Sequence, residues 1–125
     1  MASIVAARAR EREQLLELAR LYVERLERRL PIRAAVVAGS VARGDFNVWS
    51  DVDVLVVSDD LPAGALPRSA LLLEDVPARV QPVGYTRDEL VAAKRRGNPL
   101  VLTALELGVP LRGRDLLDEL AAETA

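Results

Sequence analysis

The chain has 125 residues, of which 50% are hydrophobic but only 3% aromatic, and its formal net charge is −2. It contains no cysteine and no histidine, which excludes disulfides, thiolate metal sites, Ser-His-Asp triads and histidine-based acid–base catalysis. The small negative charge gives no electrostatic basis for direct nucleic-acid binding, and no apolar run reaches the roughly 18 residues of a membrane span. We therefore expect a cytoplasmic protein whose chemistry uses carboxylates, hydroxyls, arginine and hard metal ions.

The first half of the chain predicts a long helix followed by two strands. Within residues 1–30, apolar side chains recur at helical spacing from about residue 7, and Pro31 ends the helix. The apolar stripe consists of Leu15, Leu18, Tyr22 and Leu26. A short apolar strand over 33–39 then runs into a glycine, a turn follows at 44–47, and a second strand covers 52–57.

The second half predicts a short helix at 68–74, a strand at 79–83 and then helices only. Thr86 and Glu89 form a capping box that begins a helix ending near Gly97. Asn98 and Pro99 begin the next helix, and a last one covers about 115–123. We expect one domain of the α/β (α+β) class, with a sheet core over 33–84 covered by helices at 1–30 and 86–125.

Two carboxylates, Asp51 and Asp53, stand at the leading edge of the second strand. Side chains two residues apart point to the same face of a strand, so these like charges are held close together. Such a pair is costly unless a cation lies between the carboxylates, and carboxylate oxygens suit Mg²⁺, which often completes its shell with substrate phosphates. The pair therefore predicts a metal site, against the alternative of a capped turn with strand-edge acids paired to arginine.

A phosphate-binding segment is predicted just upstream of these acids. Gly39 and Ser40 end the first strand, where backbone N–H groups and a hydroxyl could hold a triphosphate. Arg43 could add a charge-assisted contact to the same phosphates, or it could merely pair with Asp45. The nearby aromatic residues Phe46 and Trp49 are more typical of a core cover than of a platform for a base.

The run GSVARGDFNVWSDVDVLVV at 39–57 resembles the signature of the DNA polymerase beta nucleotidyltransferase superfamily. It is most similar to the minimal nucleotidyltransferases, small prokaryotic proteins with little beyond the catalytic core, and the C-terminal stretch 84–113 also resembles that group. The resemblance implies a mixed sheet flanked by helices and Mg²⁺-dependent transfer of a nucleoside monophosphate, AMP from ATP, to an acceptor. It implies that Gly39, Ser40 and Arg43 take the triphosphate, and that Asp51 and Asp53 hold the metal and are catalytic.

The sequence departs from the family pattern at one position. The family commonly has a third carboxylate on a following strand, which can serve as a third metal ligand. In this sequence the matching position, the possible third-ligand position, holds Gln81. An amide coordinates metal weakly and cannot accept a proton. Glu74 and Asp75 would substitute only if the strand began several residues earlier.

The acceptor site is expected to come from outside the chain, because 125 residues leave no room for a dedicated acceptor domain. The resemblance implies a small helical HEPN-type protein as partner, in a toxin–antitoxin pair in which the transferase modifies the toxin; a second copy of the chain is another source. A different class of function stays open because of Gln81. In that alternative the chain is a weak or inactive nucleotidyltransferase-fold antitoxin or scaffold that acts by binding its partner.

Overall fold

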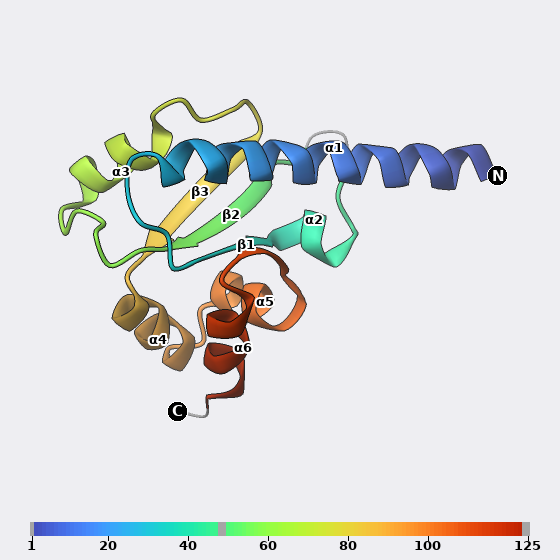
Figure 1. Ribbon diagram of the computed structural model, residues 1–125. Coiled ribbons are helices and arrows are strands. Elements are labelled where there is room, and N and C mark those ends of the chain that lie inside the picture. The colour runs from blue at the N-terminus through green and yellow to red at the C-terminus, as the bar shows by residue number, and fades with distance from the viewer. Residues whose placement is uncertain (1, 48–49, 124–125) are drawn as a thin grey trace.

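The computed structural model describes residues 2–47 and 50–123 of the chain (Figure 1). Helix α1 (Ala2–Glu27) lies along one face of a sheet, and its buried stripe contains the predicted Leu15, Tyr22 and Leu26, with Leu18 partly buried beside them. It begins earlier than expected, and residues 3–10 of its first half are exposed, so no apolar pattern marks them.

The sheet has four strands in the order β3-β2-β1-β4, and it is mixed. Strand β1 (Ala34–Ala38) pairs antiparallel with β2 (Val52–Val57) and with β4 (Val109–Arg112), whereas β2 pairs parallel with β3 (Val80–Tyr85). Every residue of the central strand β1 is buried, and so is every residue of β2 except Asp53. Such continuous apolar runs are typical of strands that are covered on both faces.

Helices cover both faces of this sheet, which confirms the predicted α/β class with a mixed sheet (Figure 1). Helices α1 and α3 (Ala65–Leu73) lie on one side, and α4 (Arg87–Arg95), α5 (Pro99–Leu107) and α6 (Arg114–Ala122) lie on the other. The core is correspondingly split, because alternate residues of β1 point to opposite faces: Ala35 and Val37 join the α1 side, and Val36 joins the α4–α6 side.

The predicted starts of α4 and α5 are confirmed by their capping hydrogen bonds. The Thr86 hydroxyl accepts from the backbone N–H of Glu89 at 3.1 Å, and the Glu89 carboxylate accepts from the Thr86 N–H at 2.8 Å. The Asn98 side chain accepts from the first N–H groups of α5, in which Pro99 is the first residue.

Two local predictions are wrong. Residues 86–125 were expected to hold helices only, but Val109–Arg112 forms the edge strand β4, which is too short to carry a periodic pattern and depends on its pairing with β1. Gly39 was expected to end the first strand, but it begins the five-residue helix α2 (Gly39–Arg43), in a left-handed backbone conformation with φ of 69°. A glycine permits that conformation, and so short a helix shows no amphipathic repeat.

Helix α6 is held by the side chain of Lys94 from α4. The Lys94 ammonium donates to the backbone carbonyls of Leu120 at 2.7 Å, Ala121 at 3.4 Å and Glu123. These carbonyls lie at the C-terminal end of α6, where a cation is favoured by the helix dipole. In the described part of the chain, no helix combines the length and the apolar character needed to cross a membrane.

Candidate functional site

The two predicted carboxylates lie where β2 begins. Asp51 is the exposed residue immediately before the strand, and Asp53 is its second residue and is half-buried. Asp53 stands opposite Ala38 in β1 and opposite Gln81 in β3. The structure therefore brings the end of β1, the start of β2 and the start of β3 together at one edge of the sheet.

The Asp53 carboxylate packs directly against Gly39. A Cβ atom placed on Gly39 would lie 2.1 Å from Asp53 Oδ2, which is far inside van der Waals contact. Gly39 is thus fixed by two independent requirements, its positive φ and the absence of a side chain. This close approach places the first turn of α2 beside the metal-binding carboxylate predicted from sequence.

The predicted phosphate-binding residues all belong to α2. Gly39 and Ser40 are its first two residues, and the residue before them, Ala38, provides no side-chain cap for the first backbone N–H groups. Arg43 is its last residue; its side chain is 43% exposed, and its guanidinium pairs with Asp45 at 3.3 Å. The predicted alternative, in which Arg43 pairs with Asp45, is therefore present. The ion pair is exposed, so it contributes little stability, and Arg43 can readily leave it for another anion.

Burial, and secondly the charge of Asp51, raise the pKa of Asp53, while the Arg43 guanidinium opposes this shift. A half-buried carboxylate with a like charge beside it is destabilising when both are ionised, and a bound cation would relieve that repulsion. Among the described residues no group of three or more acidic side chains could hold a metal, so the donor set here is a pair. A pair fits Mg²⁺, which uses one or two protein carboxylates together with water and phosphate oxygens.

Gln81 lies within this constellation. It is the second residue of β3, and its side-chain amide donates a hydrogen bond to Asp51 Oδ2 at 3.1 Å. That bond orients the Asp51 carboxylate, and it uses the amide nitrogen rather than the oxygen. Glu74 and Asp75, the alternative acids named for the place of Gln81, lie at the end of α3, where they pair with Arg29, and do not join Asp51 and Asp53.

Sequence reasoning missed the residues that hold the backbone of the site. From α1, Arg12 Nε donates to the Val41 carbonyl at 3.0 Å, and Arg8 donates to the carbonyls of Gly44, at 3.2 Å, and Phe46. The Arg8 guanidinium also lies 4.4 Å above the centre of the Phe46 ring, a cation–π arrangement. Arginines on a charged helix gave no sequence signal, because these contacts join residues about 30 or more positions apart.

A second missed anchor is Arg79, whose guanidinium donates twice to the Ser50 carbonyl, at 3.2 and 2.6 Å. Arg79 has a positive φ of 73°, and its own carbonyl accepts from Val52 N–H at 2.7 Å, so it fixes the backbone on both sides of Asp51. Of the aromatic residues, Phe46 is buried as expected of a core cover, and Trp49 lies outside the described residues.

Comparison with known proteins agrees with this geometry. A family model described as nucleotidyltransferase domain matches residues 19–101, which include strands β1 to β3, helix α2, Asp51, Asp53 and Gln81. A crystal structure from Sulfolobus solfataricus, provisionally assigned as a nucleotidyltransferase, is similar over 82% of this chain and 84% of its own, with a TM-score of 0.63 and 21% sequence identity, which supports a shared fold. No curated protein matches. The match over about two thirds of the chain shows that this protein belongs to the nucleotidyltransferase domain family.

Proposed function

We propose that the protein is a Mg²⁺-dependent nucleotidyltransferase that transfers AMP from ATP to an acceptor on a partner protein. The observation that carries this proposal is the contact between Asp53 and Gly39, which puts a carboxylate pair beside the first turn of α2. A phosphate chain held by α2 would reach the carboxylates without any rearrangement of the strands.

Each group of the site has a distinct role in this proposal. Gly39 and Ser40 would hold triphosphate oxygens through backbone N–H groups and the Ser40 hydroxyl. Arg43 would exchange its exposed pair with Asp45 for a charge-assisted contact to phosphate. Asp51 and Asp53 would hold the metal, and the ion, when bound, supplies charge neutralisation and orientation of the phosphates for in-line displacement.

The transfer itself breaks one bond and forms another at the α-phosphorus. A hydroxyl oxygen of the acceptor attacks that phosphorus, the bond to the oxygen that bridges to the β-phosphate breaks, and pyrophosphate leaves. The hydroxyl also loses its proton, which passes to solvent water, because the amide of Gln81 has no basic site to accept it. We therefore expect slow turnover, with proton transfer as the step that limits it.

The acceptor in this proposal is a protein, of the HEPN type that the sequence resemblance implies, and the reaction takes place in the cytoplasm. In support, the described residues form one sheet with helices on its two faces, and they contribute no second lobe facing Asp51 and Asp53. The wall that positions the acceptor would then come from the partner or from a second copy of this chain.

Binding of nucleotides tests the site. Each NTP would be titrated into the protein by calorimetry with and without Mg²⁺, with Asp51→Asn/Asp53→Asn as the matched variant. We expect binding that requires both the metal and the two carboxylates, and the preferred NTP identifies the base. Binding that is unchanged in the double variant, or no binding to the wild type, would contradict the proposal.

Gln81 favours a second candidate function, a non-catalytic module that binds its partner and keeps nucleotide affinity without turnover. The two candidates differ in one product. Mass spectrometry of the partner after incubation with ATP and Mg²⁺ shows an added AMP group if the protein is a transferase. A stable complex with an unmodified partner would favour the binding module.

A further inference from the structure

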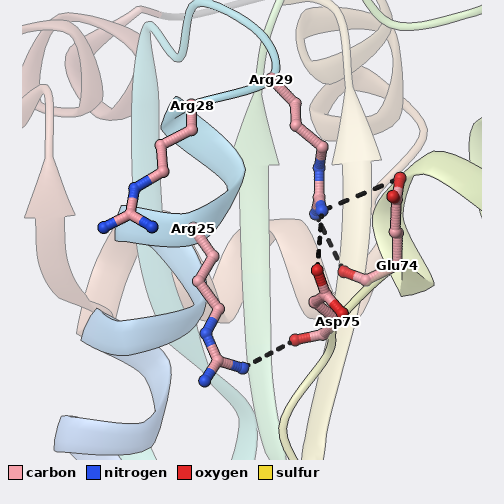
Figure 2. Close-up of a pocket in the computed structure, with 5 residues that line it drawn as sticks. All are labelled: Arg25, Arg28, Arg29, Glu74 and Asp75. Atoms are coloured by element: carbon pink, nitrogen blue, oxygen red, sulfur yellow. Dashed lines mark hydrogen bonds and ion pairs between the residues drawn. The ribbon is translucent and has the colours of Figure 1, made fainter.

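A second charged pocket lies at the C-terminal end of α1, apart from the residues of the nucleotide site. It has a volume of about 550 Å³ and is lined by Arg25, Arg28 and Arg29 on one side and by Glu74 and Asp75 on the other (Figure 2). Arg25 belongs to the last turn of α1, and Arg28 and Arg29 follow in the turn after it, three and four positions from Arg25. None of the five lining residues belongs to the predicted metal or triphosphate site.

Two of the arginines are anchored by backbone carbonyls. Arg25 Nη1 donates to the Asp75 carbonyl at 3.0 Å, and Arg29 Nη2 donates to the Glu74 carbonyl at 2.9 Å, as the dashed lines of Figure 2 show. Each bond uses one of the five N–H donors of a guanidinium. The anchors therefore fix the two side chains in place and leave most of their donors for another ligand.

Donors and positive charge are in excess in this pocket. Within the described residues, the Arg28 side chain makes no hydrogen bond or ion pair, and the buried Nε of Arg29 has no acceptor. The carboxylates of Glu74 and Asp75 stand 3.8 and 3.7 Å from Arg29 Nη1, and they are 60% and 75% exposed. Pairs at that distance and exposure are weak, so both carboxylates can turn toward water when another anion enters.

The loop that closes the pocket is held in an unusual conformation. Asp75 is not a glycine but has a positive φ of 55°, and its carbonyl is the group that Arg25 binds. Backbone in this region persists only where its surroundings hold it, and such positions are often functional. The arginines thus hold the wall of the pocket in shape before any ligand arrives.

We propose that this pocket binds a phosphate group, at a site separate from the one that takes the NTP. Arginine is the side chain best suited to recognise a tetrahedral phosphate. Arg25 and Arg29 point toward Glu74 and Asp75, whereas the Arg28 guanidinium points away from them and, having no partner in the described chain, is free to turn toward a phosphate bound there (Figure 2). The phosphate could come from a free phosphate ion, from pyrophosphate or from a nucleotide. All three carry a terminal phosphate group with free oxygens, and separate titrations of the three distinguish the sources.

The test uses the full chain in EDTA, so that metal-dependent binding at Asp51 and Asp53 does not contribute. Inorganic phosphate, pyrophosphate and AMP are titrated in turn, and the arginine Nε–H signals are followed by NMR. Arg28→Gln removes an exposed guanidinium that makes no hydrogen bond or ion pair with the described residues, so the variant is expected to fold. Arg10→Gln is the matched control, an exposed arginine of α1 that likewise makes no described hydrogen bond or ion pair. Arg43→Gln separates the pocket from the triphosphate site.

We expect saturable binding of at least one probe, with shifts at Arg25, Arg28 and Arg29. Arg28→Gln should weaken it on the order of tenfold, the usual effect of losing a charge-assisted hydrogen bond, while Arg10→Gln and Arg43→Gln leave it unchanged. The proposal is overturned if none of the probes binds, if Arg28→Gln binds as the wild type does, or if binding is lost in Arg43→Gln alone. That last result would place the phosphate at α2, in agreement with the proposed transferase site.

Discussion

Replacement of Gly39 by alanine tests the geometry on which the proposed site depends. Gly39 has a φ of 69°, and a Cβ atom there would lie 2.1 Å from Asp53 Oδ2. The added methyl group must therefore displace the Asp53 carboxylate or move the end of β1 away from β2. Gly97 is a matched control, because its φ is 77° and nothing lies within 4 Å of a Cβ atom there.

Both substitutions place an alanine in the left-handed backbone region, but only Gly39→Ala also creates a steric clash. An alanine in the left-handed region costs about 1–2 kcal/mol, and the stiffer unfolded chain returns about 0.4–1 kcal/mol, so Gly97→Ala should destabilise by about 1 kcal/mol. Gly39→Ala adds the overpacking against Asp53, about 1–3 kcal/mol more. For a domain of this size each kcal/mol lowers Tm by about 4 °C, so the expected losses are about 4 °C at Gly97 and about 8–16 °C at Gly39.

Urea unfolding and Mg²⁺-dependent NTP titration of both variants would measure these effects. We expect Gly39→Ala to lose NTP affinity at least tenfold, because Asp53 is moved, and Gly97→Ala to bind as the wild type does. If the two variants were equally stable, or if Gly39→Ala bound NTP normally, then the contact between Gly39 and Asp53 would not be part of the site.

Three other substitutions test separate features. Asp53→Asn should raise Tm at neutral pH without metal. Burial and the Asp51 charge raise the pKa of Asp53 in the folded state, so ionisation of Asp53 opposes folding. The gain in Tm should therefore shrink as the pH falls through that raised pKa. Gln81→Glu replaces the amide that donates to Asp51 by a third carboxylate; Tm should fall without metal, and Mg²⁺ should raise Tm more than in the wild type. Tyr22→Phe removes the buried hydroxyl that donates to the Leu72 carbonyl at 2.7 Å, and urea unfolding should show a loss of about 1–3 kcal/mol.

Each of these substitutions has an outcome that contradicts its premise. A lower Tm for metal-free Asp53→Asn would mean that the ionised carboxylate has a stabilising partner in the folded protein. An unchanged Tm for Gln81→Glu would mean that residue 81 does not contact Asp51 in solution. A stability change below about 0.3 kcal/mol for Tyr22→Phe would mean that the carbonyl of Leu72 is satisfied in another way.

The elements that sequence predicted correctly are those whose signals are local. The apolar stripe of α1, the apolar runs of β1 and β2 and the caps at Thr86 and Asn98 each depend on residues close together in the chain. Strand β4 was missed because four residues carry no period, and its formation depends on β1, more than 70 positions earlier.

The site shows the same division. The placement of Asp51 and Asp53 at one strand edge follows from the alternation of a strand and was predicted, as was the position of Gly39 near them. The contact of Gly39 with Asp53 and the anchors from Arg12 and Arg79 could not be predicted, since each depends on how separate elements pack in space.

The anchoring of α6 by Lys94 has a practical consequence for chemical labelling. The sequence contains a single lysine, and its ammonium is engaged by carbonyls at the end of α6. Acylation of Lys94 removes its charge and one or more donors, so an amine-directed label or cross-linker would break the contacts that anchor the end of α6 as it reacts. The rate of that reaction would then report how often the Lys94 contacts with the end of α6 open.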